Sequence, residues 1–358
     1  MSIYIHIPFC GTICTYCDFC KILYNKKYID SYLNNLENEI LERYRGEKVK
    51  SIFIGGGTPT SLDINELTRL LEITKKFNTL DNIEFTIESN IESITDDKLK
   101  IMKQYGVNRI SIGVQSFNDN IIKILGRNHT KDDIYNKIKL VKRYFDNINI
   151  DLIYAVTDDI NIVKDDVQDF LKLNIPHISV YSLIIEDKTI LKINNYCNIE
   201  EDVDYDMYKY IETTLESNGY KHYEVSNYAK EGYESKHNLV YWNNDEYYGF
   251  GLSSTSYINY NRRVNTRNLS KYLKGYYLED IIYEETDVRM ENEVMLGLRK
   301  IDGIDLNDFK KKYNKGLEDV YDISSLLEEG YLVKEGNKLR IKKEYIYISN
   351  EILVKIFS

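Results

Sequence analysis

Short apolar segments alternate with longer amphipathic segments over roughly the first two thirds of the chain. The short segments are bounded by turn residues or by the start of a helical pattern, and they predict strands at SIYIHI, SIFIGG, IEFTIES, NRISIGV, INIDLIY and HISVYSL. Residues 28–44 and 95–106 carry helical patterns, and Thr95 and Gly106 supply cap residues for the second. A series of βα units predicts an α/β fold with a parallel sheet, either doubly wound or curled toward a barrel.

The pattern changes after about residue 220. Residues 223–254 are rich in aromatic residues, Gly and Asn, and they show no long helical period. From about Glu285 onward, residues 291–314 and 324–343 predict helices followed by a small β-hairpin. The sequence therefore predicts one large domain over residues 1–270 and a compact second domain over residues 271–358.

The composition is that of a folded protein in solution, with 43% hydrophobic and 29% charged residues among 358. A formal net charge of −10 and the lack of a basic stripe argue against a general nucleic-acid binder. No secretory h-region and no apolar stretch long enough to span a membrane are present in the sequence. We therefore expect a cytoplasmic protein, in a compartment where thiols stay reduced.

Residues suited to binding chemistry fall at the C-terminal ends of the predicted strands, where parallel-sheet proteins bind ligands. The cysteine-rich segment 10–20 follows the first strand, and GGGTPT at 55–60 follows the second. Glu88 ends the third strand, Gln115 ends the fourth, and Asp151 lies in the fifth. GGGTPT lacks the Lys and the spacing of a phosphate loop, but its glycines permit close approach of the backbone to a ligand.

Four of the five cysteines lie in the first of these segments, at positions 10, 14, 17 and 20. In a reduced compartment, such a group indicates metal binding or catalysis and not a disulfide. A structural zinc site could use all four thiolates. Alternatively, Cys10, Cys14 and Cys17 in C-x3-C-x2-C could hold a four-iron cluster and leave one iron open. The second interpretation is favoured because the thiols are packed into one loop, with no second C-x2-C half.

These motifs resemble the radical S-adenosylmethionine (SAM) superfamily, and within it the branch of coproporphyrinogen III oxidases and heme chaperones. YIHIPFC, CTYCDF, GGGTPT, GVNRISIGVQSFND, LGRNHT, IDLIY, YEVSNYA and HNLVYW follow one another in the order typical of that branch, over nearly the whole chain. The resemblance implies a partial (β/α)6 barrel with a small C-terminal helical and β-hairpin domain. It also implies a 4Fe-4S cluster on Cys10, Cys14 and Cys17, with SAM bound to the open iron, where reduction can cleave SAM to a 5′-deoxyadenosyl radical.

The same resemblance implies a set of SAM-binding residues. Gly56, Gly57 and Thr58 would bind the amino end of SAM, Tyr4 would lie near its methionyl group and the backbone of Tyr16 near its adenine. The methionyl and ribose groups would contact polar side chains of Glu88, Gln115, Arg127 and Asp151. A guanidinium such as that of Arg127 pairs well with a carboxylate.

Within the branch, the sequence resembles the heme chaperones most. HNLVYW, from His237 to Trp242, matches their HNxxYW signature, in which the histidine is implicated in heme binding, and imidazole is a common axial ligand of heme iron. The CDF motif and a first strand that begins almost at Met1 favour the chaperone over the oxidase. The predicted function is therefore heme binding and delivery to hemoproteins.

Two other functions remain open at this point. The first is an enzyme, an oxygen-independent coproporphyrinogen III oxidase that forms protoporphyrinogen IX by radical decarboxylation. The second is a radical methyltransferase that acts on heme. The expected partners are heme or a porphyrinogen and recipient hemoproteins, with no nucleic acid. The sequence leaves open the recipient, the cleavage of SAM, homodimer formation and contact with a membrane surface.

The remaining thiols and histidines receive simpler interpretations. Cys20 departs from the pattern of both subgroups, and it is either a spare thiol or part of cluster or heme handling. Cys197 stands alone and predicts a surface or partly buried thiol. His6 is expected to pack or bond beside the cysteine loop, whereas the other histidines outside HNLVYW show no ligand spacing: His129, His177 and His222.

Overall fold

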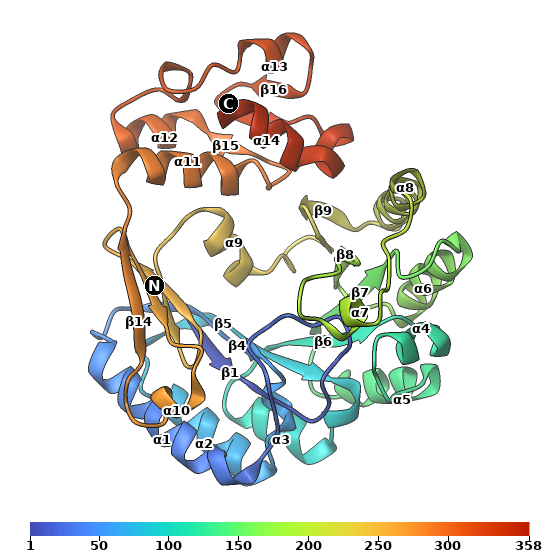
Figure 1. The fold of residues 1–358 in the computed structure, drawn as a ribbon, viewed down its shortest axis with the longest axis vertical. Coiled ribbons are helices and arrows are strands. Elements are labelled where there is room, and N and C mark those ends of the chain that lie inside the picture. The colour runs from blue at the N-terminus through green and yellow to red at the C-terminus, as the bar shows by residue number, and fades with distance from the viewer. Residues whose placement is uncertain (358) are drawn as a thin grey trace.

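The computed structural model describes residues 1–357, so Ser358, the last residue of the predicted second domain, lies outside the described residues. A twelve-stranded sheet dominates the fold, in the order β14-β13-β12-β11-β1-β4-β5-β6-β7-β8-β10-β9. Its centre is a run of consecutive parallel strands, which confirms the predicted α/β barrel-like class (Figure 1). These strands are β1 (Ser2–Ile7), β4 (Val49–Gly56), β5 (Thr79–Asn90), β6 (Arg109–Gln115), β7 (Asn147–Tyr154) and β8 (His177–Ser182).

Helices follow the parallel strands and cover the outer face of the sheet (Figure 1). They are α1 (Lys26–Arg43), α2 (Ile64–Thr74), α3 (Asp96–Gln104), α4 (Asp119–Ile124), α5 (Lys131–Val141) and α6 (Ile160–Leu173). Thr95 caps α3, because its side chain accepts a hydrogen bond from the backbone N–H of Lys98, as the sequence predicts. One continuous core of buried aliphatic and aromatic residues fills the space between the strands and these helices.

Segments outside the repeated βα pattern extend the sheet at both ends. Beyond β8 lie α7 (Ile190–Ile193), α8 (Glu201–Ser217) and two antiparallel strands, β9 (Lys221–Glu224) and β10 (Asn227–Ala229). The short helix α9 (Lys236–Trp242) contains HNLVYW, and it is followed by β11 (Tyr247–Phe250), which pairs in parallel with β1. The far edge is antiparallel and consists of β12 (Thr255–Ile258), β13 (Asn261–Asn265) and β14 (Leu278–Tyr283), with α10 (Leu269–Tyr272) between the last two.

The C-terminal part has its own core and packs on α9 through its first helix (Figure 1). It comprises α11 (Thr286–Gly297), β15 (Ile304–Asp305), α12 (Leu306–Tyr313), α13 (Ser324–Glu328), β16 (Leu332–Glu335), β17 (Lys338–Ile341) and α14 (Ser349–Phe357). The hairpin of β16 and β17 agrees with the sequence. The domain boundary at residue 270 stays a prediction; β14 still belongs to the large sheet, and the buried residues of the second core begin at Met290. Among residues 1–357 no helix is long and apolar enough to cross a membrane.

A buried ion pair joins α1 to the far edge of the sheet. Glu39 and Arg43 pair with each other inside the core. The Glu39 carboxylate also accepts hydrogen bonds from Asn265 Nδ2 at 2.6 Å and from the Tyr272 hydroxyl at 2.7 Å. Arg43 donates to Ser256 Oγ at 2.6 Å. Because both charges are paired and hydrogen-bonded, their burial is tolerated, and they fix the edge strands against the barrel.

We predict that Glu39→Gln destabilises the fold by about 3–5 kcal/mol, because it leaves the Arg43 charge buried without its partner. Urea denaturation followed by circular dichroism measures the change. Lys26→Met is the control, since it removes an exposed pair with Asp63 and should leave the unfolding midpoint unchanged. Equal midpoints for both variants and the unaltered chain would contradict the role given to this pair.

Candidate functional site

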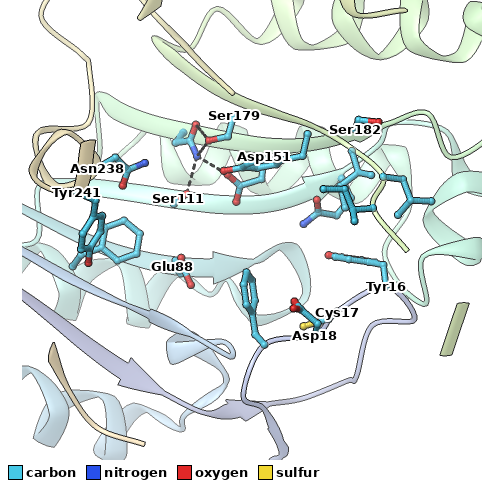
Figure 2. A pocket seen from close by; sticks show the side chains of 18 of the residues that line it. Tyr16, Cys17, Asp18, Glu88, Ser111, Asp151, Ser179, Ser182, Asn238 and Tyr241 are labelled. Atoms are coloured by element: carbon cyan, nitrogen blue, oxygen red, sulfur yellow. Dashed lines mark hydrogen bonds between the residues drawn. The ribbon is translucent and has the colours of Figure 1, made fainter. Parts of the chain in front are cut away.

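Two adjoining cavities open at the C-terminal ends of the parallel strands. The smaller, of about 120 Å³, lies against the cysteine loop, and the larger, of about 500 Å³, extends from this loop along the inside of the sheet to α9. Figure 2 shows Tyr16 and Cys17 at one end of the larger cavity and Asn238 and Tyr241 at the other. Both cavities share Glu88, and the volume of the larger cavity is typical of small-molecule sites.

The cysteine loop is fastened at both ends. The short strands β2 (Phe9–Cys10) and β3 (Ile22–Leu23) pair in parallel, so the chain returns to its own start after the loop. In the middle, the Thr15 backbone N–H donates to the Leu125 carbonyl at 3.2 Å, and Thr15 Oγ1 donates to the Ile124 carbonyl at 2.8 Å. These bonds hold residues 10–20 over the strand ends.

The three cysteines of C-x3-C-x2-C line the smaller cavity. Cys10 is buried, and burial raises the pKa of its thiol to about 11. A thiol in this environment becomes a thiolate when a metal replaces its proton. Among residues 1–357 no three His, Cys, Asp or Glu side chains gather as they would around a single metal ion. The assignment of Cys10, Cys14 and Cys17 as ligands therefore rests on their shared cavity and stays a prediction.

Gly56, which ends β4, and Gly57, which follows it, allow the cysteine loop to lie close to the sheet. Gly56 has φ of +114°, and a Cβ there would meet the ring of His6 at 2.5 Å. A Cβ on Gly57 would lie 2.7 Å from the Pro8 carbonyl carbon and 2.9 Å from Cys10 Sγ. A larger residue at Gly56 would therefore displace the His6 ring, and one at Gly57 would displace the start of the loop.

Two carboxyl groups lie in the shared wall of the cavities (Figure 2). Glu88 accepts a hydrogen bond from the Gly56 N–H at 2.9 Å, and Asp151 accepts one from Asn149 Nδ2 at 2.7 Å. Burial, and then the neighbouring Asp151 charge, raise the pKa of Glu88 to about 7. Burial also raises the pKa of Asp151. Glu88 is therefore suited to gain or lose a proton near neutral pH.

Gln115 and Arg127 complete the side of the smaller cavity that faces the loop. Gln115 is buried with φ of +72°, at a register shift between β6 and β7, and such an irregularity aims a side chain toward a site. Arg127 Nη2 donates to the Tyr16 hydroxyl at 3.2 Å. Its Nε is buried and finds no hydrogen-bond partner among the described residues.

His237 lies in the wall of the larger cavity and is 1% exposed. Ser51 Oγ donates its only proton to Ser2, so the 2.9 Å bond between Ser51 and His237 is donated by Nδ1 of the histidine. Nε2 then accepts the Tyr241 hydroxyl at 2.9 Å. Burial, and then the charges of Arg109 and Lys50, lower the pKa of His237 to about 3. The ring is thus neutral, with its lone pair at the atom bonded by Tyr241.

Every site residue predicted from the sequence lies in the wall of one of the two cavities. Tyr4 and His237 line the larger cavity alone, and the others line the smaller one: Cys10, Cys14, Cys17, Tyr16, Gly56, Gly57, Thr58, Glu88, Gln115, Arg127 and Asp151. Their roles stay predictions.

Sequence reasoning missed Arg109, Phe53 and Tyr241, which also line the larger cavity. The local signal for Arg109 is only that it is the charged residue of RISIGVQ, because its place in the cavity wall depends on strand register. Tyr241 is part of HNLVYW, but its bond to His237 depends on the helical spacing of four residues, which places both on one face of α9.

The simpler interpretations of the other residues are consistent with their contacts. His6 Nε2 donates to the Cys20 carbonyl at 2.8 Å, and the Tyr4 hydroxyl donates to His6 Nδ1 at 2.9 Å. Cys20 itself lines a neighbouring cavity of about 360 Å³, and the exposed Cys197 lies outside all these cavities. His129 pairs with a glutamate, His177 bonds Asn149 and Tyr223, and His222 stacks on Tyr228.

Comparisons with known proteins agree with this architecture. The family model described as the radical SAM superfamily matches residues 4–167, and the one described as the HemN C-terminal domain matches residues 285–344. The solved structure of coproporphyrinogen III oxidase (HemN) from Escherichia coli superposes with a TM-score of 0.87 over 99% of this chain and 89% of that chain. At 22% identity this likeness supports the fold alone.

Two curated relatives match nearly the whole chain, and a third matches more than three quarters of it. Heme chaperone HemW from Lactococcus lactis subsp. lactis is 39% identical over 99% of this chain and 96% of that protein. Heme chaperone HemW from Bacillus subtilis is 35% identical over 98% of this chain and 97% of that protein. Heme chaperone HemW from Escherichia coli is 34% identical over 78% of this chain and 77% of that protein. The chain therefore belongs to the heme chaperone HemW family.

Proposed function

We propose that this chain is a heme chaperone that binds heme in the larger cavity and delivers it to hemoproteins. The observation that carries the proposal is the end-to-end similarity to relatives named heme chaperone HemW. The cavity supports it, since heme is a flat, largely apolar macrocycle. Phe19 and Ile184 line this cavity with 67% and 68% of their surface exposed, and Tyr181 lies beside them. An apolar rim of this kind suits a ligand that enters from solvent and leaves to a partner protein.

A 4Fe-4S cluster on Cys10, Cys14 and Cys17, together with SAM, belongs to the same proposal. The match of residues 4–167 to the radical SAM superfamily supports both cofactors. The residues fit them, because the three thiols share one wall and the Arg127 Nε is a buried donor without a partner in the same cavity. When bound, a cluster held by three thiolates supplies one iron that is open to a further ligand.

The chain's own groups would position SAM in the smaller cavity. Arg127 would pair with its carboxylate, and the backbone of Gly56, Gly57 and Thr58 would lie against its amino end. The other predicted contacts are side chains of the same two cavities: Tyr4, Tyr16, Glu88, Gln115 and Asp151.

The alternative is a coproporphyrinogen III oxidase. It is favoured by Glu88, whose raised pKa of about 7 suits proton transfer in a cavity next to the cysteine loop. Recipient hemoproteins as partners follow from the chaperone proposal, and the cytoplasmic location stays a prediction of the sequence. Homodimer formation and contact with a membrane surface stay predictions of the sequence.

We predict that the anaerobically reconstituted protein binds heme and transfers it to an apo-hemoprotein, and that it leaves coproporphyrinogen III unchanged in the presence of SAM and reductant. Soret absorbance of the separated proteins measures the transfer, and mass spectrometry measures the tetrapyrrole. If coproporphyrinogen III instead loses carboxyl groups as CO2 and the protein does not bind heme, the chaperone proposal is wrong and the oxidase function is supported.

A second prediction concerns the glycine behind the cysteine loop. Gly57→Ala should strongly lower the iron and sulfide content of reconstituted protein, because its Cβ would meet the Pro8 backbone and Cys10 Sγ. Gly11→Ala is the matched control within the loop, since a Cβ at Gly11 meets nothing within 4 Å and iron should load normally. Equal iron in the two variants would show that the cluster does not depend on this close approach.

A third prediction separates His237 from its hydrogen-bond partner. His237→Ala should lose the absorption spectrum of imidazole-ligated heme, because Nε2 is the ring atom that carries the lone pair. Tyr241→Phe should keep this spectrum and bind heme at least as tightly, because it removes only the hydroxyl that occupies Nε2. An unchanged spectrum in His237→Ala would exclude this histidine as the axial ligand.

A further inference from the structure

Arg109 occupies the end of the larger cavity that lies away from the cysteine loop. It is the first residue of β6, whereas Gln115 beside the loop is the last. Arg109, Ser111 and Gln115 line the cavity because alternate residues of a strand face the same side. Arg109 is only 2% exposed, so its guanidinium is enclosed by the cavity and the surrounding core.

The Arg109 guanidinium has no direct partner. Across residues 1–357 it makes neither a hydrogen bond nor an ion pair, and its Nε is a buried donor without an acceptor. Its neighbours in register on β5 and β7 are Thr86 and Asn147. Thr86 Oγ1 and Asn147 Oδ1 are likewise buried without partners. Unsatisfied polar atoms therefore occupy one row across three adjacent strands.

Burying unpaired polar atoms in this way costs folding free energy unless a ligand supplies their missing partners. An arginine buried without an ion pair or a hydrogen bond loses its hydration and regains little of that free energy from the protein. Arg43 shows the contrast, because its guanidinium is also buried but bonds Glu39 and Ser256. A charge left unpaired in the wall of a cavity is typical of a ligand-binding group.

The acids in the same cavity wall and on the neighbouring strand β5 do not supply the missing counter-charge. Glu88 and Asp151 lie in the same wall, and the Arg109 charge acts against the burial that raises the pKa of both, yet neither forms an ion pair with it. Glu84 is committed elsewhere, because its carboxylate accepts the backbone N–H groups of Lys236 and His237 at 3.0 and 2.9 Å.

The chemistry of the two cavities indicates which anion is missing. SAM carries one carboxylate, and the smaller cavity offers Arg127 for it, so a second guanidinium needs a second anion. Arg109 lines only the larger cavity, which the proposed function assigns to heme. Heme carries propionate carboxylates, and a guanidinium pairs with a carboxylate through two parallel hydrogen bonds.

We propose that Arg109 is the anion-binding group of the larger cavity and holds a propionate of heme at its inner end. This inference rests on the proposed function, since it requires heme to occupy that cavity. The macrocycle then extends from Arg109 toward the apolar rim, and the propionate fixes its depth and orientation beside His237. Esterified heme, which lacks the charge, loses this anchor.

Binding of heme and of its propionate dimethyl ester to three proteins tests the proposal. The unaltered protein should bind heme roughly tenfold to a hundredfold more tightly than the diester, as expected for hydrogen bonds between charged groups. Arg109→Gln should bind both ligands equally, at the affinity of the unaltered protein for the diester. Arg263→Gln is the control, because Arg263 on β13 also has a buried Nε without a partner but lies outside this cavity; it should keep the preference for heme.

The outcomes separate this inference from the proposed function. If the unaltered protein and Arg109→Gln show the same preference for heme over the diester, Arg109 is not the anchor, although heme binding stands. If the unaltered protein binds neither heme nor the diester, both the chaperone proposal and the role proposed for Arg109 are wrong.

Two further readouts exclude a merely structural role. Arg109→Gln should melt at the same or a higher temperature than the unaltered protein without ligand, because it removes a buried unpaired charge. A marked drop in melting temperature would mean that the guanidinium supports the fold, and would contradict the proposal. Arg109→Lys keeps a charge but not the planar fork, so it should retain part of the preference for heme.

Discussion

The rest of the structure depends on one constraint, the parallel pairing of the central strands. These strands are hydrogen-bonded side by side in the order β1, β4, β5, β6, β7 and β8. This pairing brings the C-terminal ends of strands that are far apart in sequence to one edge. Gly56 at the end of β4 and Glu88 near the end of β5 therefore meet through a hydrogen bond. The cysteine loop can cover this edge only because the strand ends in residues without side chains.

Buried charge is used in two different ways on this framework. Glu39 and Arg43 neutralise each other, and both are also hydrogen-bonded to other side chains. The pair stabilises the fold because it holds the edge strands. Arg109, by contrast, lines a cavity without an ion-pair partner. Arg127 has a buried Nε donor without an acceptor beside the cysteine loop. We interpret the first arrangement as support for the fold and the second as preparation for anionic ligands.

Much of this architecture follows from local sequence. The parallel strands and α3 with its Thr95 cap are predictable because alternation, helical period and cap residues are local signals. The predicted ligand residues also come together, because strand ends must converge in a parallel sheet. The strands β11 to β14 were not predicted, since they are short and interrupted by Gly and Asn. Arg109 and the Ser51–His237–Tyr241 chain depend on register and on contacts between distant segments, which no local pattern reveals.

The central claim is that one edge of the sheet holds a cluster with SAM in the smaller cavity and heme in the larger. Crystals of the protein, reconstituted anaerobically and loaded with SAM and heme, can be measured at the iron absorption edge. The account predicts one compact group of iron peaks bounded by Cys10, Cys14 and Cys17, and a separate single peak in the larger cavity. A cluster held by other residues, or a heme iron outside that cavity, would contradict it.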